Sequence, residues 1–200
     1  MKRLIILVSV VLMFCAASFA SAEEAGSKAL VVVFSRAGEN YSVGVIEEGN
    51  TSKMAKIIAE QTGADLFFIE PVIPYPENYD TMLTVATQEK NDDARPEYAG
   101  DVENWEQYGT VFIGYPIWWG GVPNIVYLFL EKHDFTGKTV IPFNTHEGSG
   151  QAGTQQDIES RLPGITVLQG LAVRGSKAQN DMEGTAQEVQ DWLKQLDLIQ

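Results

Sequence analysis

Apolar residues along the chain form short continuous runs, and between these runs they recur every three or four residues. Five runs are rich in β-branched and aromatic residues, and such runs predict strands buried on both faces, as in a parallel sheet. They cover residues 29–34, 65–69, 110–115, 139–143 and 165–168, and the last allows an extension to 173. Pro142 in the fourth run is unusual for a central strand, because proline cannot donate a ladder hydrogen bond.

Helical spacing predicts five helices between these runs, over residues 51–62, 79–90, 123–132, 154–162 and 185–198. The pattern at 79–90 is the weakest of the five. Strands that alternate with helices predict one doubly wound α/β sandwich. Right-handed crossovers then bring the loops after the first, third and fourth strands to the carboxyl edge of the sheet, where a ligand is expected at the topological switch point.

The N-terminal segment differs in pattern from the rest of the chain. Lys2 and Arg3 precede apolar residues 4–17, and a small-x-small motif follows. This pattern predicts a secretory signal peptide over residues 1–22, a domain over residues 23–200, and a periplasmic or secreted location. An uncleaved membrane anchor is the alternative, although the apolar run is short for a membrane span.

Composition narrows the chemistry of the predicted domain. The only cysteine, Cys15, lies in the predicted signal peptide, so we expect no disulfide and no cysteine-ligated metal site. Loss of Lys2 and Arg3 takes the net charge from −13 to −15, which argues against nucleic acid or anionic membrane as a partner. No later apolar run is long enough to predict stable membrane insertion after cleavage. The pattern identifies no metal ligands, no catalytic residue and no oligomeric state.

The loop after the first strand begins at Ser35 and ends where the first helix begins, at Gly49, Asn50 and Thr51. Hydroxyl groups, an amide and a glycine at a helix N-terminus are suited to an anion, because backbone N–H groups and the helix dipole both favour negative charge there. Simple capping of the helix by Asn50 or Thr51 is the alternative.

Two adjacent tryptophans follow the third strand in a glycine-rich loop. Successive side chains point apart, so the pair is poorly suited to a core, whereas an indole can stack on a flat aromatic ligand. Glycine beside them lets the backbone approach such a ligand closely. Packing at the core rim is the alternative. The segment is Pro116, Ile117, Trp118, Trp119, Gly120 and Gly121.

The loop after the fourth strand offers backbone N–H groups and hydroxyls in a glycine-rich segment. An ordinary flexible loop is the alternative interpretation. A histidine in it could relay a proton, although a solvated side chain is the simpler interpretation. The residues are Thr145, His146, Glu147, Gly148, Ser149 and Gly150.

These three segments, in this order and after these strands, resemble the flavodoxin family over residues 29–174. The motifs are Gly-Asn-Thr at 49–51, Gly-Tyr-Pro-Ile-Trp-Trp-Gly at 114–120 and Thr-His-Glu-Gly-Ser-Gly at 145–150. The resemblance implies a five-stranded parallel sheet of order 2-1-3-4-5 with flavin mononucleotide (FMN) at the switch point.

The same resemblance implies a role for each matching residue. Ser35, Asn50 and Thr51 would hold the FMN phosphate; Pro116, Ile117, Trp118, Trp119 and Gly120 would border the isoalloxazine ring; and Thr145, Glu147, Gly148, Ser149 and Gly150 would bind its pyrimidine edge.

The chain departs from the family pattern in one place. About a dozen residues, 36–48, separate Ser35 from Gly49, whereas the phosphate loop of ordinary flavodoxins is compact. The insertion adds Tyr41, which could cover either the flavin or its phosphate.

Two functions of different classes follow from this resemblance. One is an electron carrier that serves a redox partner protein or a small-molecule acceptor, and small size and acidic charge favour it. The other is an FMN-dependent NAD(P)H oxidoreductase that reduces a quinone or similar molecule, and the insertion favours it as a possible substrate pocket.

Three other protein classes fit the sequence poorly. Residues 148–153 spell G-x-G-x-x-G, but too little chain follows to build a dinucleotide-binding half. Ser149 lacks the G-x-S-x-G context of a hydrolase nucleophile. A receiver domain would need carboxylates after the first strand, where Ser35 and Arg36 stand.

Overall fold

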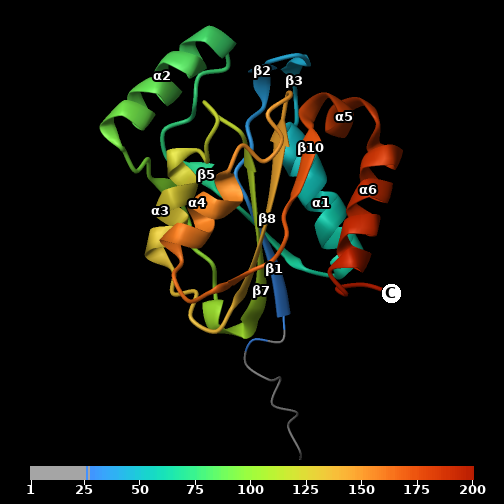
Figure 1. Ribbon diagram of the computed structural model, residues 1–200. Helices are drawn as coiled ribbons and strands as arrows, with labels where there is room; N and C mark the ends of the chain where they lie inside the picture. The colour runs from blue at the N-terminus through green and yellow to red at the C-terminus, as the bar shows by residue number, and fades with distance from the viewer. Residues whose placement is uncertain (1–25, 27) are drawn as a thin grey trace, which may run out of the picture.

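A computed structural model describes residue 26 and residues 28–200, so the predicted signal peptide lies outside the described residues. A parallel sheet with helices on both faces forms the centre of the molecule (Figure 1). Its main strands are β1 (Lys28–Val33), β4 (Asp65–Phe68), β7 (Tyr108–Pro116), β8 (Thr139–His146) and β10 (Leu171–Arg174).

The strand order is β4-β1-β7-β8-β10, and each neighbouring pair is parallel. Numbered along the chain, this is the predicted order 2-1-3-4-5, and the predicted α/β fold class is confirmed. Val32 of β1 lies between Phe67 and Ile113 of its two neighbours, so the central strand is apolar on both sides.

The fifth strand differs from the prediction, because it is broken into β9 (Thr166–Val167) and β10, which both pair with β8. The amide of Leu168 donates to Val140 O at 2.9 Å. Since alternate residues of a strand direct their polar groups to the same side, the missing N–H of Pro142 also faces this strand. At the break a Cβ on Gly170 would lie 2.6 Å from Pro142 O. The sheet therefore accommodates Pro142 beside the interruption.

Helices cover the two faces of the sheet. The described helices are α1 (Asn50–Thr62), α2 (Tyr79–Asp92), α3 (Asn124–Lys132), α4 (Thr154–Arg161), α5 (Gly175–Asn180), α6 (Met182–Gln195) and the short 3₁₀ helix η1 (Trp105–Gln107). α1, α5 and α6 lie on one face, and α3 and α4 on the other (Figure 1). α5 was not predicted, because its six residues show too little apolar periodicity.

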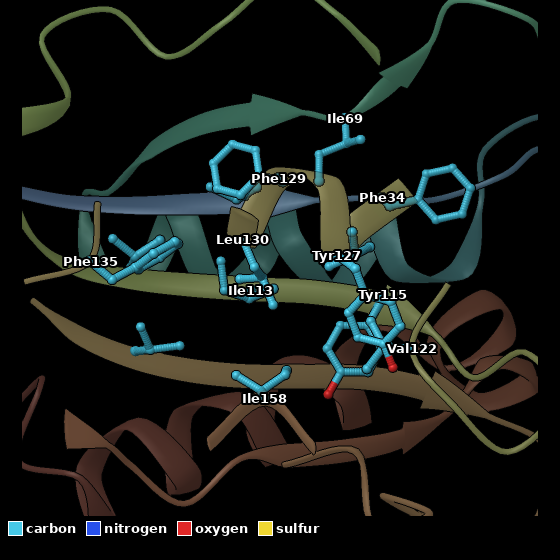
Figure 2. Packing of buried hydrophobic residues seen from close by; sticks show 14 of the residues in the cluster. Phe34, Ile69, Ile113, Tyr115, Val122, Tyr127, Phe129, Leu130, Phe135 and Ile158 are labelled. Atoms are coloured by element: carbon cyan, nitrogen blue, oxygen red, sulfur yellow. The ribbon is translucent and has the colours of Figure 1, made fainter. Parts of the chain in front are cut away.

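Two apolar clusters hold these layers together, one on each face. Met54, Phe112 and Trp192 lie in the cluster under α1 and α6. Figure 2 shows Ile113, Phe129 and others of the second cluster, which lies between the sheet and α3 and α4. Both faces of the central strands are buried, as their continuous apolar runs predict.

Two small antiparallel pairs lie outside the main sheet. The insertion folds into a hairpin of β2 (Gly38–Asn40) and β3 (Gly44–Ile46), which stands at the carboxyl edge of the sheet (Figure 1). The pair β5 (Glu70–Pro71) and β6 (Tyr98–Ala99) brackets α2 along the chain. In the part of the chain that the structure describes, no helix is long and apolar enough to cross a membrane.

Candidate flavin cleft

A cleft of about 220 Å³ lies at the carboxyl edge of the sheet. It brings together residues from all three segments that the sequence singled out, although they lie up to about a hundred positions apart. The predicted residues that line it are Asn50, Pro116, Ile117, Trp118, Trp119, Thr145 and Glu147. Ser35, Thr51, Gly120, Gly148, Ser149 and Gly150 belong to the same loops and helix end but do not line the cleft.

The N-terminus of α1 is packed tightly against the end of β1. A Cβ on Gly49 would lie 2.2 Å from Ser35 Oγ and 2.7 Å from Arg36 O, so only glycine fits here. The close approach lets Ser35 Oγ accept the Ser52 N–H at 3.0 Å. The N-cap residue is Gly49. The alternative in which Asn50 or Thr51 caps the helix is therefore wrong, because Ser35 performs this role.

Asn50 and Thr51 occupy the first two positions of α1 and differ in their surroundings. Among the described residues, their backbone N–H groups have no protein acceptor, as expected in the first turn of a helix. Asn50 Oδ1 is buried without a hydrogen-bond partner in the described part of the chain. The Thr51 hydroxyl is instead buried against the Thr145 hydroxyl, 2.7 Å away. Asn50 thus has free polar groups at the cleft, whereas the Thr51 side chain joins α1 to β8.

The two tryptophans lie in a tight turn between Trp118 and Gly121, which exchange both backbone hydrogen bonds. Trp119 and Gly120 have φ of 49° and 71°, the pattern of a type I′ turn. A left-handed conformation is rare for a bulky residue and costs about 1 to 3 kcal/mol. Both indoles line the cleft, and that of Trp119 is 51% exposed.

Trp118 has the more buried side chain of the pair. Its ring meets Phe34 and Tyr75 edge-on at centroid distances of 5.3 and 5.0 Å. It therefore also packs at the core rim, as the alternative interpretation proposed. The two indoles differ in role: Trp118 supports the cleft from the core, and Trp119 projects from the turn.

The loop after β8 is held by its own polar groups. Gly148 N–H donates to Nδ1 of His146 at 2.9 Å, which requires this nitrogen to be unprotonated. Burial, and then the charge of Arg174, lower the pKa of His146 below its ordinary value. The hydrogen bond and the lowered pKa both favour neutral His146, whose side chain fixes the loop and lines the cleft, so the expectation of a freely solvated histidine is too simple.

Glu147 binds the start of α5. Its carboxylate accepts the Ser176 N–H at 2.5 Å and the Ser176 hydroxyl at 3.1 Å. A Cβ on Gly175 would lie 2.4 Å from Asn50 Nδ2 and 3.2 Å from Glu147 Oε1. This close packing brings α5, α1 and the β8 loop to one point. Ser149 and Gly148 are exposed in the loop beyond it.

The remaining wall of the cleft comes from the insertion and from α2. Its residues are Asn40, Tyr41, Tyr79, Met82, Leu83 and Ala86. The sequence indicated Tyr41 as a covering residue, but gave no reason to place α2 at the cleft. Two signals could have found α2: it follows the connection that leaves the carboxyl end of β4, and it carries apolar Met82, Leu83 and Ala86 in an otherwise weak helical pattern.

Comparisons with known proteins match this chain to one family and to solved structures of flavoproteins. A family model described as flavodoxin matches residues 41–195. A crystal structure designated a flavoprotein, from Bacteroides eggerthii, is 29% identical, with a TM-score of 0.67, and the match covers 84% of this chain and 96% of that one. A second, from Bacteroides uniformis, is 27% identical, with a TM-score of 0.64, and covers 84% and 99%.

A more distant structure shares the fold. It is a flavoprotein in complex with FMN from Lactobacillus acidophilus, 21% identical with a TM-score of 0.58, and the match covers 76% of this chain and 96% of that one. Comparison with curated protein sequences gives no match.

Proposed function

Because the chain belongs to the flavodoxin family, we propose that it binds FMN in this cleft and carries electrons between redox partners outside the cytoplasm. The observation that carries the proposal is that the α1 N-terminus, the tryptophan turn and the β8 loop meet at one cleft. Flavin, when bound, supplies the electron-transfer chemistry, and the protein supplies binding and orientation. The Lactobacillus acidophilus structure, which holds FMN, supports this choice of flavin.

The residues at the start of α1 fit a phosphate. The backbone N–H groups of Asn50 and Thr51 are free to donate to phosphate oxygens, and the Asn50 side chain can add a donor through its Nδ2, because its Oδ1 only accepts. The first turn of α1 contains no acidic residue that would repel an anion. The helix dipole adds favourable potential. We assign Ser35 an indirect role here, because its hydroxyl is already engaged by Ser52.

The other two segments fit a flat ring with a polar edge. Trp119 offers an indole face from a strained turn, and Trp118 supports it from the core. In the β8 loop, Gly148 and Gly150 have φ of 119° and 61°. Other residues rarely adopt such conformations, which let backbone N–H groups of this loop point toward a ligand. That Thr145, Glu147, Gly148, Ser149 and Gly150 bind the pyrimidine edge stays a prediction.

Charge and exposure support the carrier role. The net charge of −13, or −15 without residues 1–22, favours rapid encounter with a basic redox partner. The half-exposed Trp119 gives the cleft an aromatic rim that a partner can approach. Location outside the cytoplasm rests on the signal peptide pattern alone. The intact mass of protein from its native host should correspond to a chain starting at Glu23, and a mass that includes residues 1–22 would contradict export with cleavage.

The second candidate is an FMN-dependent NAD(P)H oxidoreductase that reduces a quinone or similar small molecule. The observation that favours it is that the hairpin of residues 36–48 lines the cleft through Asn40 and Tyr41. Small-molecule substrates bind in concave sites, and the hairpin adds a wall that makes the cleft beside the flavin deeper.

Flavin titration tests the cofactor. The unaltered protein should bind FMN in a 1:1 ratio and should prefer it to riboflavin, which lacks the phosphate. Asn50→Ala should reduce that preference about tenfold, because a hydrogen bond to a charged group contributes about 1.5 kcal/mol or more. Asn91→Ala is the matched control, since Asn91 is exposed on α2 and does not line the cleft. Equal affinity of the unaltered protein for FMN and riboflavin would refute the phosphate assignment.

Rapid mixing with NADH or NADPH separates the two functions. A carrier should show slow or absent bleaching of the flavin absorption by either nucleotide, yet should be reduced readily by dithionite. Rapid bleaching, with sustained turnover when a soluble quinone is added, would favour the oxidoreductase. Exchange with a basic redox partner should also slow as ionic strength rises.

A further inference from the structure

The hairpin tip and the start of α2 bring two tyrosines together. The rings of Tyr41 and Tyr79 lie 6.1 Å apart and are inclined by 32°, and both line the cleft. Tyr41 is 63% exposed and belongs to neither apolar cluster. Core packing therefore does not account for an aromatic ring at this position. Two aromatic rings at the rim of a cleft offer apolar ring surface to a ligand bound there.

Glu39 fixes this pair in place. Its Oε2 accepts the Tyr79 N–H at 3.0 Å and the Asn78 amide at 2.9 Å. One carboxylate, two residues before Tyr41, thus binds the backbone of Tyr79 and the N-cap of α2. A carboxylate at a helix N-terminus also interacts favourably with the helix dipole.

Arg36 also joins the insertion to the segment before α2, as a hydrogen-bond donor. Its guanidinium donates to Pro76 O at 2.9 Å and to Glu77 O at 3.1 Å, and also to Glu39 O. Arg36 is thereby engaged by backbone carbonyls of the segment before α2. Polar contacts of Arg36 and Glu39 thus dock the insertion on the segment before α2 and on the N-terminus of α2, and the insertion and α2 form one wall of the cleft.

We propose that Tyr41, packed beside Tyr79, contacts the ring system of the bound flavin, and that Glu39 is the positioning residue that holds this aromatic pair against the cleft. The inference rests on the proposed function, because it assumes that flavin occupies the cleft. The insertion then supplies a second aromatic wall in addition to Trp118 and Trp119. Tyr41 covers the ring and not the phosphate, because it lies with Tyr79 beside the apolar side chains of α2, whereas the free N–H donors for a phosphate lie at the start of α1.

Titrations with FMN and with riboflavin distinguish a ring contact from a phosphate contact. Tyr41→Ala should weaken both flavins by the same factor, about tenfold, which is at the lower end of aromatic stacking because Tyr41 is exposed. Tyr41→Phe should keep the affinity of the unaltered protein. Val45→Ala is the control, since Val45 is 82% exposed on the same hairpin, opposite Glu39, and does not line the cleft.

A double-mutant cycle tests the positioning role of Glu39. Glu39→Ala should weaken both flavins and change the visible circular dichroism of bound FMN, while Glu39→Gln should restore both, because its amide oxygen can still accept from Tyr79. In the Tyr41→Ala background, Glu39→Ala should have little further effect. The inference would be overturned if Tyr41→Ala weakened FMN but not riboflavin, or if it left the affinity for both flavins unchanged. It would also be overturned if the effects of Tyr41→Ala and Glu39→Ala on flavin affinity were fully additive. Failure of the unaltered protein to bind FMN would instead refute the proposed function.

Discussion

α1 and α2 are helices of nearly equal length that border the same cleft, yet they are held in different ways. Seven of the thirteen residues of α1 are buried, and the five apolar ones pack in the cluster between the sheet and α1 and α6. Only Met82 and Ala86 of the fourteen residues of α2 are buried. Figure 1 shows α1 against the sheet and α2 at the periphery of the molecule.

Polar contacts at its two ends hold α2 instead. Glu39 binds its first residue, Tyr79, as described above. At the other end Lys90 Nζ donates to Trp119 O at 2.9 Å, and the Asn124 amide donates to Glu89 O at 2.8 Å. α2 therefore connects the hairpin to the tryptophan turn, and both aromatic walls of the cleft are attached to it.

This difference indicates how the two sides of the cleft behave. The α1 side, which carries the proposed phosphate site, shares the stability of the core. The α2 side depends on a few hydrogen bonds and little apolar burial, features typical of segments that open at low free energy. We expect changes on α1 to alter global stability, and changes on α2 to alter the cleft.

The largest expected difference comes from one substitution made in both helices. Met54→Ala on α1 should lower the free energy of unfolding by about 3 kcal/mol, because Met54 is fully buried in the apolar cluster under α1 and α6. Met82→Ala on α2 should lower it by about 1 kcal/mol, because the space it leaves opens to the cleft. Urea unfolding measures both values. Equal losses would contradict the comparison.

The next effect concerns the junction of α1 with β1. Gly49→Ala should lower the free energy of unfolding by about 1–3 kcal/mol and weaken FMN binding, because the added Cβ meets the backbone of Arg36. Gly121→Ala is the control: its Cβ would have 3.7 Å of clearance from Trp118 O, and its φ is not positive. Normal stability and FMN affinity in Gly49→Ala would show that α1 can shift freely.

Two glutamates near these helices should give opposite pH dependence. Burial raises the pKa of Glu89 on α2, although the Tyr75 hydroxyl donates to it. Its contribution to stability is therefore present below the unfolded pKa and lost as pH rises through the folded pKa. Burial also opposes ionisation of Glu48 beside α1, but Lys56 and Ser52 together lower its pKa. Its contribution is present above the unfolded pKa and lost as pH falls through the folded pKa.

Glu89→Gln and Glu48→Gln isolate these contributions. Stability of the unaltered protein relative to Glu89→Gln should fall as pH rises from the ordinary glutamate pKa. Stability relative to Glu48→Gln should fall as pH decreases below it. Urea unfolding across this pH range measures both, and the same sign for the two variants would contradict the assignment.

The smallest expected effect is at the far end of α2. Lys90→Met should change the free energy of unfolding by less than about 1 kcal/mol, because Lys90 is exposed, yet should speed amide exchange in residues 118–121. Lys56→Met is the matched change on α1, where Lys56 pairs with Glu48 at the surface. The proposed coupling between α2 and the tryptophan turn would be contradicted if Lys56→Met sped amide exchange in residues 118–121. It would also be contradicted if Lys90→Met left that exchange rate unchanged.

Sequence patterns alone predict the sheet and the three loops of the site. Continuous apolar runs specify strands buried on both faces, and right-handed crossovers then fix which loops share the carboxyl edge. Gly49, Asn50 and the two tryptophans could be identified because their residue types are unusual for plain structural loops. The signal peptide and the ligand contacts of the β8 loop stay predictions.

How these residues divide their roles depends on contacts between distant segments, which are seen in the folded chain. The tertiary structure assigned the capping of α1 to Ser35, joined Thr51 to Thr145, and placed Trp118 toward the core and Trp119 outward. It also brought the insertion onto α2. Local pattern could not show this, because Glu39 and Tyr79 lie forty positions apart and meet through a polar contact that leaves no apolar periodicity in either segment.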